Sequence, residues 1–187
     1  MNQQEEATFD LTGVTNSEPE ISPGTARSFE NAASIGDEKL RSTGFFVNIV
    51  RRASKSGFTG AAPLVLIVED DRGTVTVIDA VLKHRGFATR SAGNLNEIIR
   101  AVNAKPHPDL ILLDIMLPDA NGFAVLERLR RHPDLGSTPV VMLTSLSEPA
   151  DVAKGLALGA TGYMSKPAKP QALISAIEIV LGMKSEA

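Results

Sequence analysis

Four places in the sequence put a charged or hydroxyl side chain directly after a short apolar run: Glu69 with Asp70, Asp114, Thr144 and Lys166. If these groups share one crevice, the carboxylates repel one another, and a hard divalent cation relieves that repulsion. Mg²⁺ suits such a set because it prefers a few carboxylates, a carbonyl, waters and a phosphate oxygen. A lysine and a threonine hydroxyl can hold phosphoryl oxygens. These residue types predict phosphoryl transfer to a carboxylate nucleophile.

The four places can meet only if the apolar runs before them are neighbouring strands. The first run, Leu64 to Val68, is unbroken and rich in β-branched residues, as in a strand buried on both faces. Runs of this kind alternate with segments of helical periodicity, which predicts strands at 64–68, 87–91, 110–113, 140–143 and 162–164 and helices at 75–82, 95–103, 120–131, 151–158 and 171–181. The alternation predicts a doubly wound α/β fold, in which a five-stranded parallel sheet carries helices on both faces. Ligands bind such folds at the carboxyl ends of the strands, where the four groups lie.

The composition of the chain changes near residue 60. Residues 1–60 are mostly polar and lack sustained apolar periodicity, so burial cannot easily offset an ordering cost of ~1–2 kcal/mol per residue. We therefore expect a mostly disordered N-terminal extension before a domain at residues 63–183. Between Lys39 and Ser54, apolar residues could share one face of a short helix near 40–53. This segment is either a marginal helix or linker, or it docks on the domain, a partner or a membrane surface.

Charge and composition exclude several classes of protein. The formal net charge is −3, which disfavours a basic surface for nucleic acid, so no direct DNA binding is expected. The chain has no cysteine, so neither a thiolate metal site nor a thiol nucleophile is available. No apolar run approaches the ~20 residues of a membrane span, and the N-terminus has no signal-peptide pattern. We expect a cytoplasmic protein.

The ordered set of motifs resembles the receiver domain of two-component response regulators. The resemblance covers roughly residues 63–183 and is carried by Val65-Leu-Ile-Val-Glu-Asp-Asp71, Pro108-Asp-Leu-Ile-Leu-Leu-Asp-Ile-Met-Leu-Pro-Asp-Ala-Asn-Gly122, Pro139-Val-Val-Met-Leu-Thr144 and Leu158-Gly-Ala-Thr-Gly-Tyr-Met-Ser-Lys-Pro167. It implies a flavodoxin-like sheet with strand order 2-1-3-4-5.

The resemblance also implies a role for each matching residue. Asp114 would be phosphorylated, and Mg²⁺ would be held by Glu69, Asp70, Asp114 and the main-chain carbonyl of Met116. Thr144 and Lys166 would contact the phosphoryl group, and Thr144 and Tyr163 would form the conformational switch. The bond between Lys166 and Pro167 looks like the family's cis peptide, although the sequence alone does not fix the isomer.

Local structure offers simpler explanations for some of these polar residues. Asp71, Asp119 and Asn121 fit helix caps or turns better than a site. Asp114 is harder to explain in this way, because an unpartnered charge at the end of an apolar strand is costly. Tyr163 could also be an ordinary half-buried aromatic residue.

The sequence thus predicts a stand-alone phosphorylation switch rather than an enzyme in the usual sense. The expected partners are a histidine kinase or histidine phosphotransfer protein and an unknown protein target. Oligomeric state stays open, with a phosphorylation-dependent dimer among the alternatives. The rival hypothesis is an aspartate-nucleophile phosphatase or phosphotransferase acting on small molecules. Such enzymes usually carry a second Asp two residues after the nucleophile, where this chain has Met116.

Overall fold

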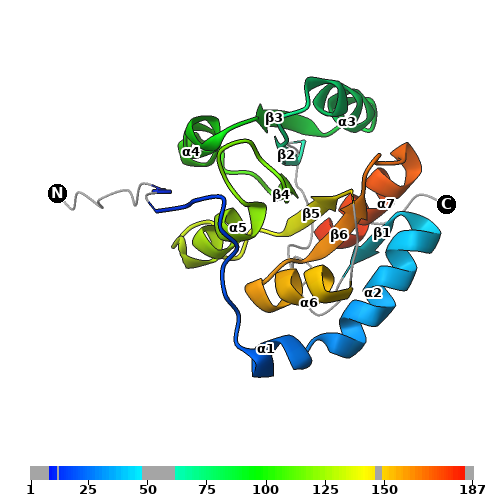
Figure 1. Cartoon of the computed structure of the whole chain (residues 1–187). Helices are drawn as coiled ribbons and strands as arrows, with labels where there is room; N and C mark the ends of the chain where they lie inside the picture. Colours follow the sequence, from blue (N-terminus) through cyan, green and yellow to red (C-terminus); the bar gives the residue numbers. More distant parts are fainter. Residues whose placement is uncertain (1–8, 12, 48–61, 146–148, 184–187) are drawn as a thin grey trace.

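The computed structural model describes residues 9–11, 13–47, 62–145 and 149–183 (Figure 1). One sheet lies between layers of helices. Its strands are β1 (Phe45–Val47), β2 (Leu64–Val68), β3 (Ala88–Ala92), β4 (Leu110–Asp114), β5 (Val140–Thr144) and β6 (Gly162–Ser165). The helices are α1 (Pro23–Arg27), α2 (Glu30–Thr43), α3 (Arg72–His84), α4 (Leu95–Asn103), α5 (Gly122–Arg131), α6 (Pro149–Leu158) and α7 (Pro170–Leu181). Within the described ranges, no helix has the length and apolar character needed to cross a bilayer.

The sheet confirms the doubly wound α/β prediction and extends it by one strand. Its order is β1-β6-β5-β4-β2-β3, so the strands from β2 to β6 are arranged 2-1-3-4-5 in chain order. These five strands are parallel to one another. The predicted count of five was incomplete, because β1 pairs antiparallel with β6 and becomes the edge of the sheet. The N-terminal extension therefore supplies a strand.

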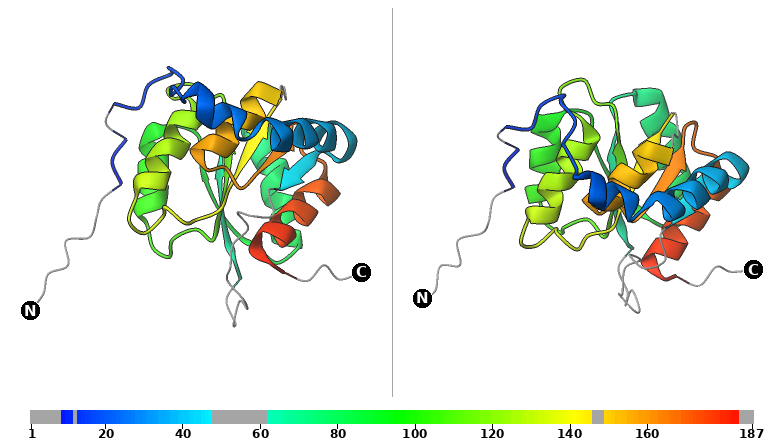
Figure 2. Two further views of the ribbon diagram at one scale, coloured as in Figure 1. Left: turned by 90° about the horizontal axis from the view of Figure 1, so that it is seen from below. Right: turned by 60° about the horizontal axis from the view of Figure 1, so that its bottom comes forward.

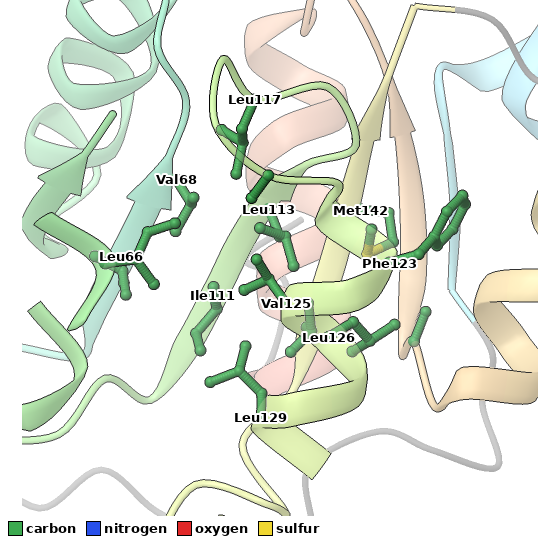
Figure 3. Close-up of a cluster of buried hydrophobic side chains, with 14 of the residues drawn as sticks. Leu66, Val68, Ile111, Leu113, Leu117, Phe123, Val125, Leu126, Leu129 and Met142 are labelled. Carbon is green, nitrogen blue, oxygen red and sulfur yellow. The ribbon is translucent and has the colours of Figure 1, made fainter. Parts of the chain in front are cut away.

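Helices on the two faces bury alternate side chains of the same strands. Leu66 and Val68 of β2 point into the cluster under α4, α5 and α6, which Figure 3 shows around α5. Val65 and Ile67 point into the cluster under α3 and α7. Because successive strand side chains face opposite ways, a strand covered on both sides must be apolar throughout. Rigid, doubly covered strands of this kind can hold polar groups precisely at their ends.

The N-terminal extension is where the structure departs most from the sequence prediction. The predicted helix near 40–53 is wrong over its described residues: α2 spans Glu30–Thr43, and Gly44 ends it with a φ of 87°. Phe45–Val47 then forms β1. Four apolar side chains of the extension are buried in the main cluster: Phe9, Leu11, Ala33 and Leu40. Residues 9–11 and 13–47 are thus ordered against the domain, because the domain supplies the apolar surface that the extension cannot make alone. The rest of the predicted helix lies outside the described residues.

Helix caps start the helices immediately after the strand ends. The Asp71 carboxylate accepts a hydrogen bond from the Thr74 N–H at 2.7 Å, which starts α3. The side chain of Asn121 accepts one from the Phe123 N–H at 2.9 Å and starts α5. These contacts confirm that both residues are caps. Each helix start turns the chain away from the sheet, which leaves the residues just before it at the strand ends.

Candidate phosphoryl-transfer site

The carboxyl ends of adjacent strands bring the predicted charged residues together. Glu69 follows β2 and Asp114 ends β4, and both are almost fully buried. Lys166 follows β6, on the far side of β5. Its Nζ lies 2.6 Å from Oε2 of Glu69 and 2.8 Å from Oδ2 of Asp114. One ammonium group therefore links the ends of two strands through ion pairs with both buried carboxylates.

The burial of this cluster shifts the pKa values of its members. Burial raises the pKa of Glu69, and the charge of Asp114 raises it further, although hydrogen bonding and the charge of Lys166 oppose both effects. Burial would lower the pKa of Lys166, but its hydrogen bonds and ion pairs with Asp114 and Glu69 outweigh that effect and raise it. Lys166 is therefore firmly protonated, whereas the ionised form of Glu69 is destabilised by its burial.

The acidic cluster fits a divalent cation. Glu69, Asp70 and Asp114 each offer a carboxylate oxygen, and these three oxygens lie within 4.8 Å of one another. Asp70 is exposed, whereas the other two are buried, so the cluster opens to solvent on one side. Hard oxygen ligands with an open side suit Mg²⁺, which keeps several waters and binds phosphate oxygens. Burial is the main cause of the raised pKa of Glu69, and a cation here would relieve the smaller contribution from repulsion by Asp114.

Met116, two residues after Asp114, borders the site without being buried. The backbone N–H of Met116 donates a hydrogen bond to Oδ1 of Asp114 at 3.2 Å. Its side chain is 71% exposed. The backbone of Met116 therefore lies beside the carboxylate, while the thioether faces solvent. The role of its carbonyl as a metal ligand stays a prediction.

Thr144 and Lys166 are joined through their backbones. Thr144 is buried at the end of β5 and pairs in register with Ser165 of β6. The Lys166 N–H donates to the carbonyl oxygen of Thr144 at 2.7 Å. The next peptide bond, between Lys166 and Pro167, is cis, as the resemblance implied. Any displacement of one of these strand ends therefore acts directly on the other.

Tyr163 is fully buried rather than half-buried. Its hydroxyl donates a hydrogen bond to the carbonyl oxygen of Asp151 in α6 at 2.8 Å. Burial raises the pKa of this phenol, and the nearby charge of Asp151 adds to the effect. A Cβ at Gly155 would lie 1.7 Å from the Tyr163 oxygen, so the ring fits only because residue 155 is glycine. Its role as a switch stays a prediction.

Gly122 fits a permissive turn glycine by its sequence position rather than a site residue, yet it packs on the site. A Cβ at this position would lie 2.1 Å from the carbonyl oxygen of Asp114 and 2.9 Å from the Cα of Ile115. The start of α5 thus packs directly on the backbone that carries the phospho-acceptor candidate. The sequence string contained this glycine, but its spacing alone could not indicate so close an approach.

Two acidic residues near the site stay outside the cluster, as expected. The hydrogen bonds that Asp71 accepts at the start of α3 lower the pKa of its carboxyl group. Asp119 accepts hydrogen bonds from the N–H of Leu95, at 3.0 Å for the shorter contact. Both carboxylates satisfy backbone donors, and neither is a member of the cluster of Glu69, Asp70 and Asp114.

Comparison with known proteins places this arrangement in a family. The family model of the response regulator receiver domain matches residues 65–178. Among curated relatives, the phosphate regulon regulatory protein PhoB of Escherichia coli is 37% identical over 117 residues, which are 63% of this chain and 51% of that protein. The DNA-binding response regulator MtrA of Mycobacterium leprae is 40% identical over 113 residues, covering 60% of this chain and 48% of the relative. The chain spans about half the length of the curated relatives it matches.

Solved structures agree with this assignment. A response regulator from Chloroflexus aurantiacus superposes with a TM-score of 0.61 at 30% identity, covering 65% of this chain and 98% of that one. The chemotaxis protein CheY4 of Vibrio cholerae also has a TM-score of 0.61 at 30% identity, covering 65% of this chain and all of the other, 100%. With the cluster of acids and lysine at the strand ends, these matches show that the chain belongs to the response regulator receiver domain family of two-component signalling.

Proposed function

We propose that Asp114 accepts a phosphoryl group from a phosphohistidine of a histidine kinase or phosphotransfer protein. A carboxylate oxygen of Asp114 forms a bond to phosphorus while the bond from phosphorus to the imidazole nitrogen breaks, and the electron pair remains on the imidazole. The observation that carries the proposal is the setting of Asp114: a buried carboxylate 2.8 Å from a protonated lysine and beside two further acids. This setting favours a nucleophile over a simple structural ion pair, because two buried acids share one ammonium group and a third acid, Asp70, lies beside them.

The residues around Asp114 would have separate roles in the phosphoryl transfer. Glu69, Asp70, Asp114 and the carbonyl of Met116 would hold Mg²⁺, which when bound neutralises charge on the transferred oxygens. Lys166 is already paired with the Asp114 carboxylate. As negative charge develops on the transferred phosphoryl oxygens, its ammonium group can pair with one of them instead. The hydroxyl of Thr144, at the end of the intervening strand, supplies a hydrogen-bond donor to another oxygen.

The signal is the acyl phosphate itself rather than a product released in many turnovers. An enzyme that hydrolysed small phosphoesters would need a proton donor near the leaving group, and the thioether of Met116 carries no transferable proton. We therefore propose Mg²⁺-dependent self-phosphorylation and dephosphorylation at Asp114 as the only chemistry of the domain.

The added charge would bias an equilibrium between two surfaces. A phosphoryl group brings about two negative charges and strong acceptor oxygens, which attract Thr144 and Lys166. Movement of these residues, with Tyr163 as the switch, would alter a surface read by a protein partner or a second copy of the chain. We propose protein contact in the cytoplasm as the output, and no direct binding of DNA, since the net charge is −3.

Phosphoryl uptake tests the proposal with a small donor. The full chain is incubated with Mg²⁺ and acetyl phosphate or phosphoramidate, and intact mass is recorded over time. Wild type is expected to gain one phosphoryl group, and Asp114→Asn to gain none. Asp119→Asn is the matched control, because Asp119 is an exposed acid of the same loop that satisfies a helix N–H instead. Labelling of Asp114→Asn to the wild-type level would contradict the proposal.

A further inference from the structure

The N-terminal part of the chain wraps around one side of the receiver domain. We call residues 9–47 the strap; residue 12 within it lies outside the described set. The strap runs past α5, lies along α6 and ends as β1 beside β6 (Figure 2). It therefore covers a face made by α6 and β6, the two elements that follow Thr144 and precede Lys166 in the chain.

The strap closes the edge of the sheet next to the site. Phe45, Phe46 and Val47 pair antiparallel with Met164, Tyr163 and Gly162. Beyond this pairing, the N–H of Ser165 donates to the carbonyl oxygen of Gly44 at 2.9 Å, and the Ser165 hydroxyl donates to the same atom. Ser165 is also paired with Thr144 on its other side and is bonded to Lys166. A hydrogen bond of the strap thus lies one residue from the lysine that holds both buried acids.

The strap also fits closely on α6. A Cβ at Gly36 in α2 would lie 3.0 Å from both Phe46 of the strap and Val152 of α6. Lys154 of α6 forms an ion pair with Glu18 of the strap. The same ammonium lies 5.3 Å from the centre of the Phe123 ring in α5. Helices α2 and α6 pack as closely as elements of a domain core, so a small shift of α6 would displace α2 as well.

A third contact reaches the loop that follows Asp114. The N–H of Asn121 donates to the carbonyl oxygen of Thr15 at 3.1 Å. Asn121 caps α5 and precedes Gly122, which packs on the Asp114 carbonyl. The strap therefore contacts the loop after β4, helix α6 and the end of β6. Each of these segments adjoins a residue of the site.

The charge of the strap indicates the direction of its response. It carries six acidic residues and three basic ones: Asp10, Glu18, Glu20, Glu30, Asp37, Glu38, Arg27, Lys39 and Arg41. Added negative charge at Asp114 repels this segment. Attraction of Lys166 toward a phosphoryl group would draw the end of β6 inward, away from the Gly44 carbonyl that Ser165 contacts.

We propose that the strap is an intramolecular occupant of the α6–β6 face, and that phosphorylation of Asp114 weakens its docking and exposes that face. The inference rests on the proposed function, because it needs the phosphoryl group. The exposed face would present an unpaired strand edge and an apolar helix surface, which fit a partner segment that forms a helix followed by a strand. A strap that only adds stability would stay docked whatever the state of Asp114.

Distance measurements between two labels test strap release in the full chain. Because the chain has no cysteine, Ile35→Cys on α2 and Val77→Cys on α3 give two specific spin-label sites, which are 56% and 54% exposed. Without phosphoryl donor, pulsed electron resonance should give one narrow distance distribution. With Mg²⁺ and acetyl phosphate, the distribution should broaden and shift to longer distances in proportion to phosphoryl uptake, and the same labels in Asp114→Asn should show no change.

Intact mass, recorded on the same samples, separates the two hypotheses. Full phosphoryl uptake with an unchanged distance distribution overturns the strap inference and leaves the proposed function standing. Absence of uptake contradicts the proposed function, and the inference falls with it. A change in distance that also occurs in Asp114→Asn overturns the inference too, because it would not depend on the acceptor.

A substitution inside the strap tests the coupling from the other end. Gly36→Leu should push α2 off α6 without weakening the helix itself, since leucine is a better helix former than glycine. Because coupling between sites is reciprocal, this variant should bind the phosphoryl analogue beryllofluoride with Mg²⁺ about five-fold or more tightly than wild type. Gly24→Leu in α1 is the matched control, because a Cβ there meets nothing within 4 Å. The coupling is overturned if Gly36→Leu lengthens the distance between the labels at positions 35 and 77 but binds beryllofluoride with the same affinity as wild type.

Discussion

Lys166 is the residue on which the charge balance of the site depends. Its Nζ lies within 2.8 Å of carboxylate oxygens from two different strand ends. The sequence predicted this meeting, because residues directly after parallel strands share one edge of a sheet. The double ion pair itself depends on the reach of the lysine across β5, which no spacing in the sequence specifies. The same geometry makes a neutral residue at this position costly.

Lys166→Met should destabilise the metal-free protein by about 2 kcal/mol, because it leaves two buried carboxylates without their counter-charge. This figure is below the full cost of breaking a buried pair, since the lysine side chain is 21% exposed. Urea denaturation without Mg²⁺ measures the change. Lys169→Met, at an exposed position three residues along, should leave the free energy of unfolding almost unaltered. Equal stability of the Lys166 and Lys169 variants would show that the ion pairs contribute nothing.

Glu69 gives the site a pH dependence of known sign. Its folded-state pKa lies above the ordinary value of 4.5, so the folded protein holds this proton more tightly than the unfolded chain. Without Mg²⁺, the wild-type free energy of unfolding should therefore fall, relative to that of Glu69→Gln, as pH rises from 4.5 through the raised pKa. Denaturation from about pH 4 to about pH 8 measures the difference between the two proteins. A difference that stays constant with pH would contradict the burial argument.

Among the elements, β6 carries Tyr163, the residue that the family resemblance assigns to the switch, and α6 packs over its ring. Tyr163 is buried because Gly155 leaves room for its ring and the Asp151 carbonyl accepts its hydroxyl. The resemblance identified the tyrosine, but neither its depth nor the glycine beneath it could be derived from the sequence. Close approaches of this kind depend on how two elements pack, not on the periodicity of either.

Gly155→Ala should expel Tyr163 from its pocket, because the new methyl group would overlap the phenol oxygen. The chain has one tyrosine and no tryptophan, so the long-wavelength near-ultraviolet absorbance, beyond the range where phenylalanine absorbs, and the tyrosine fluorescence report this ring. The variant should show a solvent-exposed tyrosine spectrum and should titrate closer to the ordinary phenol pKa of 10.0. Gly24→Ala should retain the buried spectrum. An unshifted spectrum in Gly155→Ala would mean that α6 moves instead of the ring.

The N-terminal elements α2 and β1 show why part of the fold could not be predicted from the sequence. The helical face predicted between Lys39 and Ser54 includes Phe46 and Val47, yet both follow Gly44, whose positive φ ends α2. That glycine was the available signal in the sequence. A three-residue strand such as β1 has no period of its own and exists because the edge of β6 offers hydrogen bonds. Its position is a property of the assembled sheet.

At the scale of the whole molecule, the strap joins the edge of the sheet, a surface helix and the loop after Asp114. The five strand–helix units were predictable because each repeats the same local pattern of a buried strand and an amphipathic helix. The apolar residues of the strap are irregularly spaced, and four of them, Phe9, Leu11, Ala33 and Leu40, are buried on surfaces made by distant parts of the chain. The molecule is thus a receiver domain that covers one of its own faces.

Chemical trapping of the acyl phosphate tests the central claim most directly. The full chain is treated with Mg²⁺ and acetyl phosphate, reduced with borohydride, digested and mapped by mass spectrometry. Reduction of an aspartyl phosphate leaves homoserine, so the account predicts homoserine at position 114 and unmodified side chains at Glu69, Asp70 and Asp119. Homoserine at Asp70 or Asp119, or phosphoryl uptake with Asp114 intact, would contradict it.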